Sequence, residues 1–234
     1  MKIPAAPYDF PITGSLNPGR TALLIIDMQR DFCDYGGYTH TRGDDVSAMR
    51  LIIPFITAVR SAALRAGMTI VYTREGHRPD LSDLPECKRL KTAGAGAEIG
   101  TKGPLGRLLV RGEPGWDFIP ELKPNPGDIV VDKPGTGAFY STDLYHVLVT
   151  KGIENVILTG VTTGVCVSTT AREAADRGFN VLVLDDCCAE PDPGNHAIAI
   201  QLLKIESGYL ATVTTSDAFT KAVYTLSSSE VENV

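Results

Sequence analysis

Six short runs of β-branched and aliphatic residues alternate along the chain with segments of helical spacing. Several runs are almost continuously apolar, which is typical of strands covered on both faces of a sheet. The runs are Thr21–Ile26, Met68–Thr73, Asp128–Val131, Asn155–Thr159, Asn180–Leu184 and Tyr209–Val213. The helical segments are clearest at Val46–Ala66, Thr142–Lys151, Val165–Arg177 and Asn195–Ile205. This alternation predicts an α/β fold, a three-layer α/β/α domain built on a parallel six-stranded sheet.

One long segment, residues 74–127, interrupts this alternation. It is rich in glycine, proline and charge, with weak helical content only around Gly106–Arg111. Loops of this length in compact domains are usually functional or disordered. Because this one follows the carboxyl end of a strand, where open α/β sheets bind ligands, we expect an active-site wall or lid. We expect a single domain over residues 1–234, with a core of about residues 20–225.

Composition and charge narrow the classes of function. The net charge of −6 disfavours nucleic acid or an anionic membrane as a partner. Met1–Arg20 has no apolar signal region, and no uninterrupted apolar run approaches the roughly 18 residues that span a bilayer. Five cysteines in a chain without an export signal are expected to be reduced thiols. We therefore expect a cytoplasmic protein.

Three polar residues stand where predicted strands end. Asp27 closes the first apolar run, Lys133 follows the third, and Cys166 lies a few residues beyond the fourth. Since the carboxyl ends of parallel strands share one edge of a sheet, we expect these side chains to meet. A helix start and a neighbouring lysine would favour the Cys166 thiolate, while an aspartate can take and return its proton. Backbone amides at that helix start can hold the oxyanion of a tetrahedral intermediate.

Each of these residues also has a structural interpretation. A single cysteine at a helix start is more often an inert, buried side chain. An aspartate after a strand is frequently a cap or turn residue, and a lone lysine at a strand end is usually solvated. The coincidence of all three at strand ends nevertheless favours a function, which we interpret as cysteine hydrolase chemistry.

Three segments resemble the signatures of the isochorismatase-like cysteine hydrolases, in the order that the family has them. They are Leu24–Phe32, Asp132–Pro134 and Thr159–Val167. The similarity spans roughly residues 20–215 and implies an isochorismatase-like, Rossmann-like fold. It implies that Asp27 is the general base, that Lys133 orients and charges the pair, and that Cys166 is the nucleophile. It also implies a cis peptide bond at Val161–Thr162 and an oxyanion hole made by the amides of Thr162 and Cys166.

The resemblance also discriminates between members of the family. Isochorismatases proper lack the nucleophilic cysteine, so Cys166 argues against that reaction. Nicotinamidases usually carry an Asp-x-His…His metal site, whereas the matching stretch here, Thr73–Asp80, has the single histidine His77. We interpret His77 as a hydrogen-bonding loop residue and expect no metal and no other cofactor. His196 follows Gly194–Asn195 at a predicted helix start and is interpreted as a capping-region residue.

Further segments resemble biuret and triuret hydrolases, namely Thr73–Leu81, Arg111–Asp117 and Leu184–Cys188. This resemblance implies a short, planar, neutral ureide as the small-molecule substrate, and a homo-oligomer, either dimer or tetramer. Such a substrate needs acceptors for its NH₂ groups and donors for its carbonyls. Arg74, Glu206 and the backbone near Phe32 are the candidate substrate-binding groups. The alternative for Arg74 is a surface ion pair with Glu75 or Asp80.

Glu206 stands where the biuret hydrolases that resemble this chain have glutamine. A carboxylate only accepts hydrogen bonds, so the change favours a substrate that presents NH₂ groups there. We therefore expect a triuret hydrolase, which would release ammonia from triuret and give carboxybiuret, then biuret and CO₂. The alternatives are a biuret hydrolase, then a ureidoacrylate or N-carbamoyl amide hydrolase, and, outside enzymology, a metabolite-binding relative. For Glu206 itself, the structural alternative is an exposed residue that ends a helix.

Overall fold

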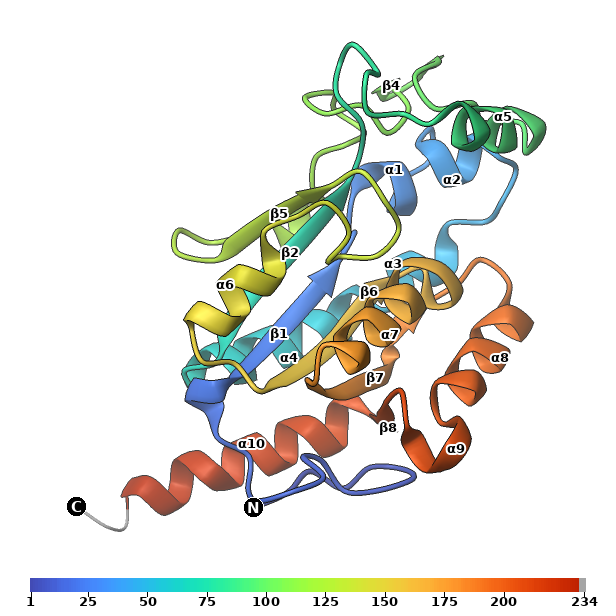
Figure 1. Ribbon diagram of the computed structural model, residues 1–234. Coiled ribbons are helices and arrows are strands. Elements are labelled where there is room, and N and C mark those ends of the chain that lie inside the picture. The colour runs from blue at the N-terminus through green and yellow to red at the C-terminus, as the bar shows by residue number, and fades with distance from the viewer. Residues whose placement is uncertain (232–234) are drawn as a thin grey trace.

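A six-stranded parallel sheet forms the centre of the molecule (Figure 1). The computed structural model describes residues 1–231, with side chains described as far as residue 225. Along the sheet the order is β5-β2-β1-β6-β7-β8, and every neighbouring pair is parallel. The strands are β1 (Thr21–Ile26), β2 (Thr69–Glu75), β5 (Ile129–Lys133), β6 (Asn155–Val161), β7 (Asn180–Ala189) and β8 (Thr212–Thr214).

Helices cover both faces of this sheet. On one face lie α3 (Ser47–Leu51), α4 (Ile53–Arg65) and α10 (Ser216–Val231), and on the other lie α6 (Leu144–Thr150), α7 (Ser168–Asp176) and α8 (Pro193–Leu203). Within β1, Leu23 and Ile25 pack into the first layer, while Leu24 and Ile26 pack into the second. Burial on both faces explains the continuous apolar run. The predicted three-layer α/β/α fold is confirmed.

Several predicted elements differ in their bounds; β7, for example, continues to Ala189 instead of ending at Leu184. The predicted helix Val46–Ala66 is divided into α3 and α4, because Pro54 lies in the first turn of α4, where a missing N–H is tolerated. The final strand begins at Thr212 instead of Tyr209, because the chain first forms the short helix α9 (Ile205–Gly208).

The α3–α4 segment is also apolar in overall composition. By length and hydropathy alone, Ser47–Arg65 is apolar enough to cross a membrane, although no uninterrupted apolar run marks it. Here Met49, Ile56 and Val59 are fully buried in the core of the sheet's first layer. The segment is therefore accounted for as core helices of this fold.

The long excursion between β2 and β5 has more structure than expected. It contains α5 (Glu86–Gly94), the two-stranded hairpin of β3 (Lys102–Gly103) and β4 (Gly106–Arg107), and a 3₁₀ turn at Pro120–Leu122. The weak helix expected around Gly106–Arg111 is wrong, because this stretch begins with the hairpin strand β4.

One buried carboxylate fastens the excursion to the rest of the molecule. Asp31 lies in α1 (Arg30–Cys33) and accepts hydrogen bonds from the amides of Leu109 (2.9 Å) and Tyr38 (3.2 Å). Tyr38 begins α2 (Tyr38–Thr41), so Asp31 joins three segments. Figure 1 shows that they gather beyond the carboxyl ends of β1 and β2.

Candidate active site

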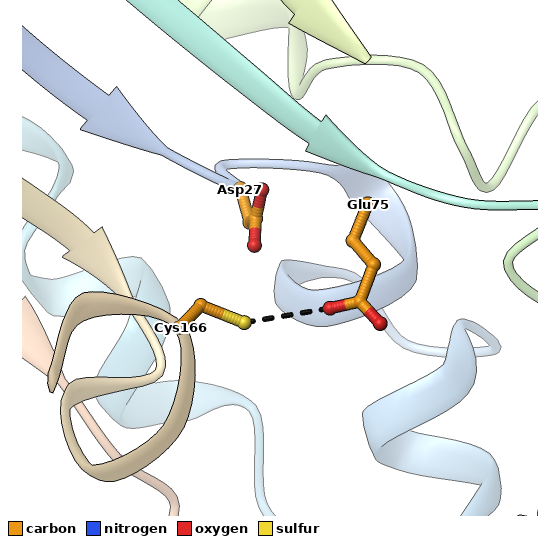
Figure 2. A group of neighbouring side chains, drawn as sticks. All are labelled: Asp27, Glu75 and Cys166. Atoms are coloured by element: carbon orange, nitrogen blue, oxygen red, sulfur yellow. Dashed lines mark hydrogen bonds between the residues drawn. The ribbon is translucent and has the colours of Figure 1, made fainter. Parts of the chain in front are cut away.

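Four side chains from four neighbouring strands meet at the carboxyl edge of the sheet. Asp27 directly follows β1, Glu75 ends β2, and Lys133 ends β5. Cys166 lies in a π-helical turn, Thr163–Val167, that follows β6. Figure 2 shows Asp27, Glu75 and Cys166 directed toward one another. The structure thus brings Asp27, Lys133 and Cys166 together and adds a carboxylate that the sequence reasoning missed.

The four groups form one buried cluster. Lys133 Nζ lies 2.7 Å from Asp27 Oδ2 and 3.5 Å from Glu75 Oε2. The Cys166 thiol donates to Glu75 Oε2 at 3.4 Å (Figure 2). Asp27 and Lys133 are wholly inaccessible to solvent, and Glu75 and Cys166 are each 4% exposed. In such a setting, charge interactions are much stronger than in water.

Strand register explains why Glu75 joins this cluster. Glu75 pairs with Lys133 across β2 and β5, and cross-strand neighbours point to the same face of a sheet. Thr73, two residues earlier and therefore on the same face, donates to Asp27 Oδ1 at 2.6 Å. The expected strand ended at Thr73, but the strand actually continues for two residues. Asp27, Lys133 and Cys166 were selected because they stand at or just beyond the ends of predicted strands. The same criterion would have selected Glu75 if the true end of β2 had been known.

Lys133 is a fixed cation. Besides Asp27, its ammonium donates to the carbonyls of Gly135 (3.0 Å) and Thr136 (2.9 Å). Burial alone would lower the pKa of Lys133, but Asp27, Cys166 and Glu75 outweigh it and hold that pKa above its ordinary value. The lysine therefore stays charged at any working pH.

The two carboxylates have opposite proton affinities. Burial raises the pKa of Asp27, which Lys133 only partly offsets. Burial also acts on Glu75, but the ammoniums of Lys133 and Lys88 outweigh it and hold the Glu75 pKa below its ordinary value. Asp27 is thus the carboxylate that can take up and return a proton, whereas Glu75 remains an anion.

The Cys166 thiol holds its proton more tightly than an ordinary thiol does. Burial raises its pKa, and Asp27 and Glu75 add to the effect that Lys133 opposes. Lys133 favours the thiolate as the sequence led us to expect, but desolvation and the two nearby carboxylates outweigh that one ammonium.

Side chains from α8 and β7 fix the turn that carries Cys166. Thr163 Oγ1 lies 2.8 Å from His196 Nδ1, and His196 Nε2 lies 2.9 Å from Asp185 Oδ1. His196, interpreted from the sequence as a capping-region residue, therefore connects α8 and β7 to the turn that carries Cys166. The Val161–Thr162 peptide bond is cis, as the resemblance implied. Gly160 before it has φ +108, and a Cβ there would lie 2.0 Å from the Ile26 carbonyl.

Comparison with known proteins agrees with this geometry. Residues 21–218 match the isochorismatase domain. The chain belongs to the isochorismatase family. It is 33% identical to a ureidoacrylate amidohydrolase of Klebsiella pneumoniae over 203 residues, which cover 82% of this chain and 81% of the relative.

Solved structures of other proteins share the fold. A cysteine hydrolase from Pseudomonas syringae pv. phaseolicola superposes with a TM-score of 0.74 at 28% identity, covering 90% of this chain and 95% of that one. N-carbamoylsarcosine amidase from Thermoplasma acidophilum gives 0.64 at 25% identity, covering 85% and 97%. The predicted membership among isochorismatase-like cysteine hydrolases is confirmed, and the protein is an amidohydrolase that acts on C–N bonds.

The other predicted site residues of this family member lie in different places. Phe32 is buried in α1, at the same edge as Asp27. Arg74 points to the opposite face of the sheet from Glu75, where it pairs with Asp132 (2.8 Å) and stacks on the Trp116 ring at 3.7 Å. Neither of its proposed surface partners, Glu75 or Asp80, is the one it uses.

Glu206 does not join the buried cluster of Asp27, Glu75, Lys133 and Cys166. It lies in α9, is exposed, and adopts a left-handed backbone with φ 50. Figure 1 shows α9 at the end of the molecule away from α1 and α5. Within the described chain, Glu206 therefore stands at the opposite edge of the sheet from Cys166.

A metal ion at the cluster would have to compete with Lys133. Asp27, Glu75 and Cys166 present three possible ligand atoms within 4.8 Å of one another. Lys133 Nζ already contacts both carboxylates and Lys88 Nζ contacts Glu75, so two ammonium groups supply the positive charge there. Behind them, His77 Nε2 lies 3.0 Å from Lys88 Nζ and His77 Nδ1 lies 3.3 Å from Asp83, so both its ring nitrogens are occupied. These residues do not fit a resident cation.

Proposed function

We propose that the protein hydrolyses a terminal C–N amide bond of a small linear ureide and releases ammonia. One observation carries this proposal. The Cys166 thiol is buried beside a proton acceptor of raised pKa, Asp27, and a fixed ammonium, Lys133. A binding module has no need of a thiol next to a base.

The reaction follows from these three groups. Asp27 takes the thiol proton as Cys166 Sγ attacks the carbonyl carbon, and the oxyanion is received by the amides of Thr162 and Cys166. Asp27 then returns the proton to the nitrogen, the C–N bond breaks, and ammonia leaves a thioester. A water molecule, deprotonated by Asp27, attacks that thioester and restores the thiol. Lys133 holds Asp27 in position and balances its charge throughout.

The charge balance of the site favours a neutral substrate. The ammoniums of Lys133 and Lys88 are each paired with a carboxylate, so a substrate carboxylate would gain little attraction there. Two buried carboxylates are suited to accept hydrogens from NH₂ groups. Triuret and biuret fit this description, and triuret remains our first candidate. Triuret is supported as a substrate because it is neutral and carries NH₂ groups. Glu206 no longer supports it, because that residue lies far from Cys166.

A second candidate is ureidoacrylate. The Klebsiella pneumoniae relative carries that name and shares one third of its residues with this chain over most of both lengths. Both substrates end in a ureido group, so the same cysteine chemistry would serve either. The difference lies in the carboxylate that ureidoacrylate carries.

Ammonia release from triuret, biuret, ureidoacrylate and nicotinamide tests the proposal, with Cys166→Ser as the control. We expect turnover of the neutral ureides and binding without turnover in the variant. Preference for ureidoacrylate would replace the neutral-substrate argument with the second candidate. The proposed reaction would be contradicted if no ureide released ammonia, or if Cys166→Ser released ammonia as fast as the wild type.

A further inference from the structure

Glu75 is held through both its carboxylate oxygens and its backbone. Its Oε1 accepts from Lys88 Nζ at 2.7 Å, and its Oε2 accepts from the Cys166 thiol and lies near Lys133. Its backbone is clamped by the Gln29 side chain, which accepts from Glu75 N (2.7 Å) and donates to Glu75 O (3.0 Å). A carboxylate whose oxygens and backbone are all hydrogen-bonded keeps a fixed position, so it is suited to contact a substrate group at a defined place.

The position of Glu75 relates it to the reacting atoms. Its Oε2 lies 3.4 Å from Cys166 Sγ, which is the distance of a direct contact. An amide whose carbonyl carbon bonds to Sγ carries its nitrogen on the next atom, within hydrogen-bond reach of Oε2. Because an ionised carboxylate only accepts, it can receive an N–H but repels an ester oxygen at that place.

We propose that Glu75 is a catalytic residue that stays ionised and accepts a hydrogen bond from the NH₂ group of the scissile amide. Lys88 acts as its positioning residue, because its ammonium fixes Oε1. This inference rests on the proposed function and names the group that selects a primary amide. The proton still travels from Cys166 to Asp27 and on to the leaving nitrogen, while Glu75 exchanges none. As the nitrogen gains that proton, the hydrogen bond to an anion strengthens, which lowers the barrier.

Lys88 connects this role to the excursion. It reaches Glu75 from α5 and also donates to the Pro134 carbonyl at 2.9 Å, next to Lys133. The groups that face Glu75 are therefore Lys88, Lys133, Asp27 and Cys166, with His77 behind Lys88. The position of α5 therefore places the Lys88 ammonium, which together with Lys133 keeps Glu75 charged.

Kinetics on the preferred ureide test the role in turnover. Glu75→Gln keeps the shape of the side chain and removes its charge. We expect kcat to fall about 100-fold with a smaller change in KM, because the hydrogen bond matters most as the nitrogen gains its proton. For Lys88→Met, we expect the acid limb of kcat/KM to move to higher pH, since Glu75 loses one ammonium. The matched control is Lys91→Met, an exposed lysine of the same helix, which should leave the profile unchanged.

Alkylation of Cys166 tests the charge and the NH₂ contact without any ureide. Iodoacetamide offers an NH₂ group, and its N,N-dimethyl analogue does not. Mass spectrometry of the Cys166 peptide measures alkylation by each reagent. The exposed Cys87 is replaced by serine in all proteins so that it does not react. For Glu75→Gln we expect alkylation to begin about one pH unit lower, since an anion beside the thiol is gone. We also expect the preference for iodoacetamide to fall severalfold.

The two measurements separate the two proposals. If no ureide is turned over but alkylation changes as described, the proposed ureide substrate fails, while the charge of Glu75 and its contact with an NH₂ group beside the thiol stand. If Glu75→Gln keeps the wild-type alkylation profile and probe preference, or Lys88→Met behaves as Lys91→Met does, the assignment is overturned. A Glu75→Gln protein that does not fold leaves the Lys88→Met and Lys91→Met pair to decide.

Discussion

Asp27 and Lys133 form a fully buried ion pair, 2.7 Å between Oδ2 and Nζ, although their strands are not neighbours. Strand β2 lies between β1 and β5, and its last residue, Glu75, lies against the same ammonium. Lys133 is the counter-charge of Asp27, and it shares Glu75 with the ammonium of Lys88. The cluster is therefore a structural unit as well as a chemical one.

Removal of Lys133 should affect folding as well as activity. Loss of one partner of a buried ion pair costs about 3–5 kcal/mol, because the other charge is left uncompensated. We expect Lys133→Met to abolish turnover and to lower the free energy of unfolding by about that amount. The double variant Asp27→Asn/Lys133→Met should recover much of the stability and none of the activity. Urea unfolding of the three proteins checks this; equal stabilities of the single and double variants would contradict it.

Asp31 should make stability depend on pH. Burial raises its pKa to about 6, despite hydrogen bonds from the Leu109 and Tyr38 amides. Between pH 3.8 and about 6, the folded protein therefore holds a proton that the unfolded chain releases. The Asp31 contribution to the free energy of unfolding falls by about 3 kcal/mol as pH rises through that window and is constant above it.

The comparison of wild type with Asp31→Asn isolates this contribution. Asparagine has the same shape but does not titrate. We expect the wild-type advantage in unfolding free energy to shrink as the pH is raised from 4 to 7. Urea titrations at several pH values measure the difference. A difference that stays constant or grows over this range would show that Asp31 is not protonated in the folded protein.

Arg74 should contribute to stability and not to substrate binding. It lies on the far face of β2, paired with Asp132 and stacked on Trp116. We expect Arg74→Met to lower the free energy of unfolding by about 1–2 kcal/mol and to leave KM within about twofold. The free energy of unfolding of Arg74→Lys should lie between those of wild type and Arg74→Met, since lysine keeps the charge but cannot stack as a plane on Trp116. A large rise in KM at unchanged stability would restore the sequence-based assignment.

Glu206→Gln should leave substrate preference unchanged. The residue is exposed in α9, at the opposite edge of the sheet from Cys166. We expect the ratio of triuret to biuret turnover to stay within about twofold of wild type. A shift of that ratio toward biuret would contradict this expectation. It would indicate that Glu206 reaches an active site after all, for example that of another copy of the chain.

The sequence by itself determined the layers and the edge at which the chemistry lies. Runs such as Thr21–Ile26 are apolar on both sides because helices cover both faces. Their short length and their alternation with helical segments identify them as interior strands. The carboxyl ends of parallel strands share an edge, which is why Asp27, Lys133 and Cys166 were recognisable as a group. These conclusions depend only on local patterns.

Only the tertiary structure decided which side chains complete that group. Register between β2 and β5 pairs Glu75 with Lys133 and Arg74 with Asp132, so adjacent residues serve opposite faces. Register depends on how two distant segments pack, and neither segment encodes it alone. The proton affinities follow from the same packing, because burial and the number of nearby ammoniums leave Asp27 with a raised pKa and Glu75 with a lowered one.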